Sequence, residues 1–179
     1  MKILKKIGLG IVALIAIVLF AGLFISRDFS FEKSITINAP IDAVWENTNS
    51  LADLDRWSPW ADYDPNQKHE LFGTDGTVGA KKTWDSEVEN VGKGSQTIVK
   101  MEAPTLFETF LSFEKPFKSE AKGFVKLKPD GSDKTIVSWS FESEMPYPMN
   151  IMKLFMNMDE SIGKDFNIGL SKLKKLCEG

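Results

Sequence analysis

Apolar and polar positions are unevenly distributed along the chain, which begins with a continuous apolar run. Residues Ile7 to Ile25 carry no charge over 19 positions. As a helix rising 1.5 Å per residue, this run is roughly 28 Å long, close to the ~30 Å hydrocarbon core of a bilayer. Lys2, Lys5 and Lys6 precede the run. A lysine-rich N-terminal flank predicts a cytoplasmic N-terminus, with everything after Arg27 on the outer side of the membrane.

A cleaved secretory signal is the alternative interpretation of this run. Such signals have an apolar region of roughly 7–15 residues followed by a cleavage site with small residues. The run here is longer, and only a poor site follows Ala21. We therefore predict an uncleaved signal-anchor over residues 1–26, which makes the protein a single-pass protein of the cell membrane.

After the anchor, the hydrophobic period changes to that of a strand and two short helices. Apolar and polar residues alternate from Phe29 to Ala39, which predicts a half-buried strand. Pro40 ends the strand and favours the first turn of a helix, since proline is tolerated there. A second short helix is predicted over Leu51 to Trp57.

From Lys68 onward, short alternating segments are separated by turn residues, as is typical of a continuous antiparallel meander. The predicted strands are Lys68–Phe72, Ala80–Ser86, Gly94–Met101, Leu106–Glu114, Ser119–Lys128 and Thr135–Glu144. Glycine, asparagine or proline stands in each break between them.

The chain ends in an amphipathic pattern that predicts one long helix, from about Asn150 to Cys177. Apolar residues recur on a single arc at 100° per residue. Gly163 and Gly169 each weaken such a helix by roughly 1 kcal/mol relative to alanine. Because Gly169 lies in the middle of the apolar arc, we expect close packing against the sheet at that position.

Length and charge restrict the class of protein. The 153 residues of 27–179 suit one compact domain, expected to be monomeric. Without the three N-terminal lysines, 19 basic residues oppose 25 acidic ones, a net charge of −6. This balance argues against binding nucleic acid, and against docking on anionic lipid through a basic surface. The single Cys177 cannot form an internal disulfide.

The sequence offers little catalytic or metal-binding chemistry. Its one histidine, His69, lies on a predicted strand without a cluster of metal-ligand residues nearby. Residues 73–79 and 92–94 are rich in glycine but do not match a phosphate-binding loop, so we interpret them as turns. We predict no metal, no cofactor and no catalytic residue.

Several aromatic residues have two interpretations, as ligand contacts or as core. Trp57 and Trp60 lie at the end of a short helix, where they either form the rim of a cavity or cap the core. Trp84, Phe113 and Trp139 face inward on predicted strands. An antiparallel sheet that curls around a long helix leaves a gap between the two layers, which is a common place for an apolar ligand.

The predicted long helix contributes further candidate ligand contacts. Met152, Phe155 and Met156 lie on or beside its apolar stripe, and methionine adapts to ligands of variable shape. Asp159 falls within the same arc, where its carboxylate would reach a ligand head group, pair with a base or be solvated at the cavity mouth. Lys82, on the same strand face as Trp84, is the base to consider.

Six segments along the chain carry a resemblance by their order and spacing, namely Ser34–Glu46, Arg56–Pro65, Val78–Ser86, Gly92–Ser95, Phe113–Ser119 and Met152–Leu170. Their order resembles the helix-grip (SRPBCC) superfamily, which includes START lipid-transfer domains, the birch-pollen-allergen family and bacterial polyketide cyclase-like proteins. The similarity is greatest to the last group, in its membrane-anchored form. The resemblance implies an α+β helix-grip fold, in which a curved antiparallel sheet of about seven strands wraps a long C-terminal helix.

The resemblance also implies an internal apolar cavity, but not a reaction. We therefore expect non-catalytic binding of a hydrophobic small molecule or lipid by a domain tethered to the membrane through residues 7–25. One alternative is a polyketide cyclase-like enzyme with Asp159 or His69 as acid or base. The other is a protein-interaction module of the cell envelope.

Overall fold

The computed structural model describes residues 2–155, 157 and 159–179, and gives only the backbone of Lys2, Asp159 and Ser161. Two compact units are present. The first combines Met1–Phe29 with Glu144–Asn157, and the second combines Ser30–Ser143 with Met158–Gly179.

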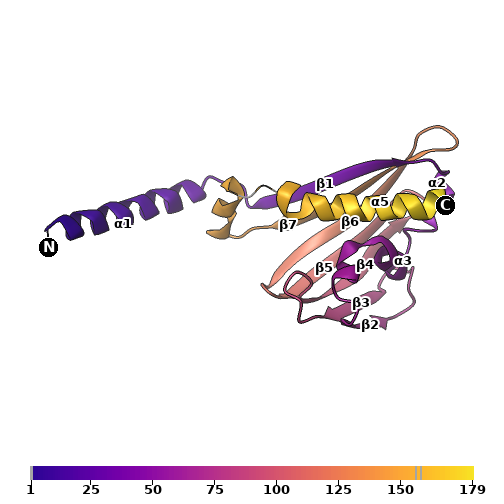
Figure 1. Cartoon of the computed structure of the whole chain (residues 1–179), viewed down its shortest axis with the longest axis horizontal. Coiled ribbons are helices and arrows are strands. Elements are labelled where there is room, and N and C mark those ends of the chain that lie inside the picture. The colour runs from indigo at the N-terminus through magenta and orange to yellow at the C-terminus, as the bar shows by residue number, and fades with distance from the viewer. Residues whose placement is uncertain (1, 156, 158) are drawn as a thin grey trace. The chain divides into compact units, whose positions relative to one another are not determined.

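The second unit is built on a seven-stranded sheet in the order β1-β7-β6-β5-β4-β3-β2 (Figure 1). Neighbouring strands from β2 to β7 are antiparallel, which confirms the predicted meander. The strands are β1 (Asp28–Ile37), β2 (Lys68–Phe72), β3 (Lys81–Asp85), β4 (Lys93–Glu102), β5 (Leu106–Lys115), β6 (Ser119–Pro129) and β7 (Thr135–Glu144). At one edge of the sheet, β1, the first strand of the chain, lies beside β7, the last strand.

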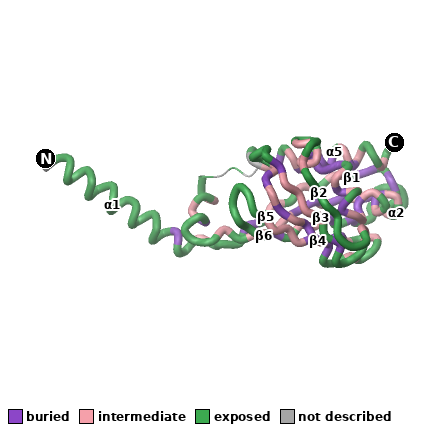
Figure 2. The backbone as a smooth tube through the Cα atoms, turned by 90° about the horizontal axis from the view of Figure 1, so that it is seen from below, coloured by how far each residue is buried: buried purple, intermediate pink, exposed green. Residues whose placement is uncertain are grey.

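One face of this sheet is covered by helices from two parts of the chain. Three short helices, α2 (Ile41–Trp45), α3 (Leu51–Trp57) and α4 (Pro59–Tyr63), come between β1 and β2. The C-terminal helix α5 (Lys164–Glu178) packs on the same face of the sheet. Buried residues gather between this face and the helices (Figure 2). This arrangement confirms the helix-grip fold that the sequence predicts.

Local side-chain hydrogen bonds fix the start of α3. Ser50 is the N-cap residue, and its hydroxyl oxygen accepts a hydrogen bond from the backbone N–H of Asp53. The carboxylate of Asp75 accepts two more, from the N–H groups of Leu51 at 2.9 Å and of Ala52 at 3.0 Å. The glycine-rich segment 73–79 therefore serves as a turn that also caps a helix.

The sheet and α5 form a closely packed core at one end only. There Phe107 of β5 is paired with Val125 of β6, and Val125 with Trp139 of β7. Leu170 and Leu173 of α5 are almost completely buried in the same cluster. Towards the opposite end of β6 the inward positions are small, namely Gly123, Ala121 and Ser119, and there a cavity separates the sheet from the helices.

Gly169 is tightly packed, as its place in the apolar arc predicts. A Cβ atom added there would lie 2.7 Å from the ring of Trp139 and 3.3 Å from the backbone oxygen of Trp57. A hydrogen as side chain thus allows α5 to approach the sheet closely.

The prediction of one long helix from Asn150 is wrong for its first half. Residues Met149–Leu154 form a short 3₁₀ helix, η1, and Asp159–Gly163 form a π-helical turn, η2, before α5 begins at Lys164. The amide of Asn150 donates hydrogen bonds to the carbonyl oxygens of Gly22 and Ile25, so η1 packs against the N-terminal helix. Periodicity alone does not show this long-range contact.

The first unit contains the apolar helix α1 (Lys2–Gly22). Its stretch Ile3–Gly22 has a mean hydropathy of 2.4 and is exposed as far as Ala21, and only Gly22 at its end is buried (Figure 2). By length and composition this helix is able to cross a membrane, although a signal sequence has the same properties. The predicted boundary between anchor and domain near Arg27 stays a prediction.

Candidate functional site

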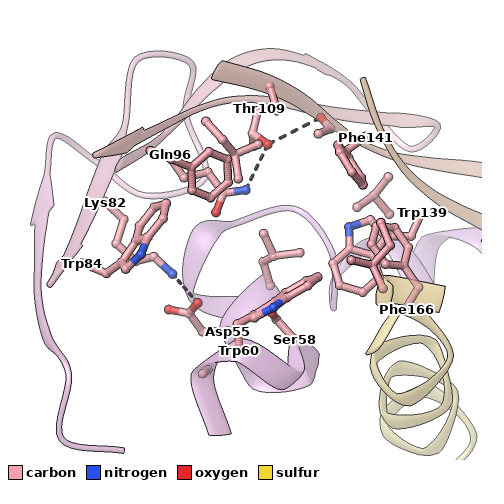
Figure 3. A pocket seen from close by; sticks show the side chains of 18 of the residues that line it. Asp55, Ser58, Trp60, Lys82, Trp84, Gln96, Thr109, Trp139, Phe141 and Phe166 are labelled. Atoms are coloured by element: carbon pink, nitrogen blue, oxygen red, sulfur yellow. Dashed lines mark hydrogen bonds and ion pairs between the residues drawn. The ribbon is translucent and has the colours of Figure 1, made fainter. Parts of the chain in front are cut away.

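A cavity of about 350 Å³ lies in the second unit, between the sheet and the helices α3, α4 and α5 (Figure 3). Ligand-binding pockets in proteins commonly measure roughly 300–1,000 Å³. The residues that line it include Asp55, Ser58, Trp60, Lys82, Trp84, Gln96, Phe107, Thr109, Leu111, Phe113, Ser119, Ala121, Gly123, Trp139, Phe141, Ser143, Ile162 and Phe166.

The cavity is hollow because the strand in its floor carries small side chains. Alternate residues of a strand share one face, and on β6 the inward positions Ser119, Ala121 and Gly123 line the cavity. A Cβ atom at Gly123 would lie only 2.9 Å from the Thr109 hydroxyl oxygen, so the glycine lets the Thr109 side chain of β5 lie close to β6. Larger side chains on the neighbouring strands then surround an open space.

Aromatic rings form the wall next to α5. The Trp139 ring stacks on that of Phe166 with their centroids 4.2 Å apart, and meets Trp60 edge to face at 5.6 Å. Edge-to-face and offset-stacked pairs are favourable arrangements for aromatic side chains. This wall is therefore a rigid apolar surface rather than a set of loose side chains.

A second pair of rings stands on the β3–β5 side. Trp84 and Phe113 meet edge to face at 5.8 Å, and the Trp84 indole N–H donates to the backbone oxygen of Val91 at 3.1 Å. The Trp84 ring lies directly over Gly94, where an added Cβ would come within 2.6 Å of it. The glycine thus fixes the position of this tryptophan.

The cavity wall also contains an ion pair. The ammonium group of Lys82 on β3 is bonded to the carboxylate of Asp55 on α3 (Figure 3). The Lys82 side chain is only 14% exposed, and a charge withdrawn from water needs a close partner to offset its lost hydration. The structure thus gives Lys82 the partner Asp55, while the side chain of Asp159, considered as its partner from the sequence, lies outside the described residues.

A neutral polar group lies deeper in the cavity. The side-chain amide of Gln96 donates to the Thr109 hydroxyl oxygen at 3.0 Å, and that hydroxyl in turn donates to the backbone oxygen of Gly123 at 3.5 Å. These hydrogen bonds use only the nitrogen of the Gln96 side-chain amide. The carbonyl oxygen of the same amide is directed into the cavity (Figure 3). The oxygen is available to accept a hydrogen bond from a bound molecule.

Polar contacts between α4 and α5 hold the Trp60 side of the cavity. The phenol of Tyr63 donates to the carboxylate of Asp165, and Lys172 is bonded to Asp62 at 2.7 Å. The hydrogen bond to Asp165, with smaller effects of burial and negative charge, raises the pKa of Tyr63 to about 12. The phenol therefore remains a neutral donor at physiological pH.

Half of the ten residues proposed from the sequence as ligand contacts line the cavity, namely Trp60, Lys82, Trp84, Phe113 and Trp139. Trp57 is fully buried in the core, with its indole N–H bonded to the backbone oxygen of Asn47, and does not line the cavity.

The candidates from the predicted long helix are placed differently. Met152 and Phe155 belong to the first unit, where both are exposed, and are not among the described residues that line the cavity. Met156 lies outside the described residues, as does the side chain of Asp159. The selection of Met152 and Phe155 depended on a continuous helix, which the chain does not form at these two positions.

Sequence reasoning missed Asp55, Gln96, Thr109 and Phe166 as lining residues. The alternation along β5, where Phe107, Thr109, Leu111 and Phe113 all line the cavity, contains a usable signal. Thr109 is the polar residue within this otherwise apolar inward face. Such a residue either hydrogen-bonds another buried polar group or faces a cavity. Nothing local identifies Asp55, because its role depends on Lys82, 27 residues later.

Other reactive residues lie elsewhere. His69 is exposed on the edge strand β2 and is not among the described lining residues. Burial raises the pKa of the half-buried Cys177 thiol to about 11, so little nucleophilic thiolate forms at neutral pH. In the part of the chain that the structure describes, no three His, Cys, Asp or Glu residues are grouped to hold a metal.

The seven-stranded sheet, the C-terminal helix and the cavity between them define a class of protein, the helix-grip proteins. Residues 28–178 match the model of the family described as polyketide cyclase / dehydrase and lipid transport. The chain therefore belongs to this family. No curated protein matches the chain.

Solved structures share the fold at low sequence identity. A truncated norcoclaurine synthase from Thalictrum flavum has a TM-score of 0.63 at 14% identity, over 84% of this chain and 94% of the synthase. A conserved protein from Geobacillus kaustophilus has a TM-score of 0.59 at 18% identity, over 83% and 95%. Protein CV1439 from Chromobacterium violaceum has a TM-score of 0.56 at 14% identity, over 84% and 98%. At these identities the likeness concerns the fold alone.

Proposed function

We propose that this protein binds a hydrophobic small molecule in the cavity of a membrane-tethered helix-grip domain, without catalysis. The observation that carries the proposal is the cavity itself, with aromatic walls and few polar groups. A folded domain loses dispersion contacts and leaves apolar surface unburied when it keeps such a space. A bound apolar molecule restores the dispersion contacts and buries the apolar surface.

The shape and polarity of the cavity restrict its ligand. A volume of about 350 Å³ holds on the order of a dozen waters at ~30 Å³ each, which suits a compact ring system and not a whole diacyl lipid. The rings of Trp60, Trp84 and Trp139 favour a flat, aromatic or polycyclic molecule. A hydroxyl or N–H group would reach the oxygen of Gln96, and an acidic or polar group would lie near Lys82.

The tether in this proposal is the segment 1–26, with 27–179 as the domain outside the cytoplasm. Its support is the apolar helix α1 and the three lysines that precede residue 7. The bilayer is a reservoir of hydrophobic molecules, and a tethered cavity remains close to it. Residues 7–25 thus increase the local supply of ligand.

An enzyme is the second candidate, and one observation favours it. Lys82 and Asp55 form a titratable pair in the cavity wall, where a general acid or base would contact a bound substrate. Among the described residues, however, no further titratable group converges on this pair within the cavity lining. Binding without chemistry is therefore the better-supported function.

The first test identifies the ligand. Full-length protein extracted in a mild detergent is expected to carry a small ring-containing molecule, which denaturation releases in near-stoichiometric amount for mass spectrometry. The same extraction of an unrelated single-pass protein controls for membrane lipid carried along nonspecifically. Recovery of detergent and bulk phospholipid alone contradicts the binding proposal. Conversion of the recovered molecule by the purified protein, lost in Lys82→Met, supports the enzyme.

The second test concerns the side of the membrane. A reporter that is active only outside the cytoplasm, fused after Gly179, is expected to be active because the lysines before Ile7 retain the N-terminus in the cytoplasm. The matched fusion carries a reporter that is active only in the cytoplasm. If that reporter alone is active, the proposed orientation is wrong.

A further inference from the structure

The segment Glu144–Asn157 contains an exposed apolar surface that the cavity does not use. Its apolar side chains stand largely in solvent, with exposed fractions of 50% for Met149, 46% for Met152, 65% for Leu154 and 81% for Phe155. Large apolar side chains gathered on one short segment usually mark a site that contacts a protein or a membrane. We call these four side chains the η1 patch.

The segment that carries the η1 patch is attached to the end of α1. Asn150 is 1% exposed, and its amide donates to the carbonyl oxygens of Gly22 at 2.8 Å and Ile25 at 2.9 Å. The last carbonyls of a helix have no partner within it, and Asn150 supplies one. The side chain of Ile151 also packs closely on Gly22. A Cβ atom added to Gly22 would lie 2.6 Å from the Ile151 side chain.

A lysine strengthens the attachment on its polar side. The ammonium group of Lys153 donates to the backbone oxygens of Ser26, at 3.1 Å, and Asp28. The backbone N–H of Met145 donates to the oxygen of Arg27 at 2.8 Å. The segment is therefore held to residues 22–28 by hydrogen bonds at several points along its length.

From this attachment we propose that the η1 patch is embedded in the bilayer, at the boundary between head groups and acyl chains where α1 leaves the membrane. This inference rests on the proposed role of α1 as an anchor. The apolar run 7–25, which begins after the three N-terminal lysines, is 19 residues long, or roughly 28 Å as a helix, close to the ~30 Å hydrocarbon core. Gly22 and Ile25 then lie near its outer edge, and η1, bonded to both carbonyl oxygens, lies at the same depth.

The chemistry of the segment fits that depth. Phe155 and the methionines provide apolar surface, while Lys153 and Arg27 place positive charge beside them, where lipid phosphates lie. Leu23 and Phe24, which follow α1, are also exposed and continue the apolar surface. A bilayer, rather than a second protein, is the partner because the patch begins where the membrane-spanning helix ends.

The test measures the depth of single residues in the full-length protein. In a Cys177→Ser background, an environment-sensitive fluorophore is attached to Phe155→Cys, and the protein is reconstituted into phosphatidylcholine vesicles. Leu14→Cys, in the middle of α1, is the membrane control, and Ser132→Cys, in the exposed β6–β7 turn, is the aqueous control. The Phe155 probe is expected to show blue-shifted emission, quenching by lipids brominated near the glycerol, and protection from aqueous iodide, while the Leu14 probe is expected to be quenched by lipids brominated near the ends of the acyl chains.

The outcomes separate this inference from the proposed function. If the Leu14 probe is quenched by brominated lipid but the Phe155 probe behaves as the Ser132 probe does, the η1 patch is not embedded and the anchor stands. If the Leu14 probe is not quenched by brominated lipid, the anchor itself is wrong. A Phe155 probe that is protected from iodide but not quenched by brominated lipid indicates protein contact and overturns the inference. A Met152→Cys probe repeats the measurement at a second site.

Discussion

Replacing Ala121 by phenylalanine is expected to abolish ligand retention while changing the free energy of unfolding very little. Ala121 lies on β6 in the floor of the cavity, where an aromatic ring enters space that the ligand would occupy. We expect the affinity for the ligand to fall at least about tenfold, or 1.4 kcal/mol. Mass spectrometry of the extracted protein and chemical denaturation followed by circular dichroism measure the two effects.

Two matched substitutions show whether the space at Ala121 is real. Ala80→Phe introduces the same ring at a position that is 1% exposed in the closely packed core, where overpacking costs about 1–3 kcal/mol. Ala52→Phe places it on the exposed surface of α3, where neither quantity should change. If Ala121→Phe destabilises the protein as much as Ala80→Phe and leaves the bound ligand unchanged, the cavity is not the binding site.

Trp139→Ala is expected to cause the largest loss of stability, about 3–5 kcal/mol. The centroid of the Trp139 ring lies 4.8 Å from that of Trp57, 5.6 Å from that of Trp60 and 4.2 Å from that of Phe166. Trp139 therefore joins the sheet to the three helices α3, α4 and α5. Truncating it removes these contacts and extends the cavity into the core. The midpoint of urea unfolding, measured in a constant detergent concentration, reports the effect.

Trp84→Ala is the control for losing a tryptophan as such. Trp84 is partly exposed and has one aromatic partner, Phe113, together with the hydrogen bond to Val91. We expect a clearly smaller loss of stability there, because less surface is buried and no helix depends on it. Equal losses at the two positions would contradict a central structural role for Trp139.

Much of the fold was predictable because the hydrophobic period is a local property. Strands Lys68–Phe72 and Thr135–Glu144 begin and end in the structure where their patterns begin and end. The same holds for the helix Leu51–Trp57, whose start is fixed by the adjacent Ser50. Each is determined by neighbouring residues, so no distant contact was needed to recognise it.

The C-terminal helix shows where periodicity fails. The apolar pattern from Asn150 fits one helix, but Asn150 itself bonds to carbonyl oxygens more than 120 positions earlier in the sequence. This contact offers residues 149–154 a favourable alternative to a continuous helix. Met152 and Phe155 therefore lie in the first unit and are not among the described residues that line the cavity.

The site was predictable in its aromatic residues but not in its polar ones. Large rings on inward strand positions are conspicuous in the sequence, and Trp84, Phe113 and Trp139 all line the cavity. Asp55 and Gln96 gain their roles only through Lys82 and Thr109, from other elements. Such pairing is a property of the folded sheet and helices, since nothing in the spacing of the four residues specifies it.

By itself, the sequence determined the order of strands and helices, the apolar N-terminal helix and the family, because each is written in local periodicity or in motifs along the chain. Tertiary structure decided that the space between the layers remains open. That outcome depends on the small residues Ala121 and Gly123 of β6 sharing the cavity lining with rings from other elements. A cavity is defined by atoms that are absent from a shared volume, and only the folded arrangement shows which side chains share it.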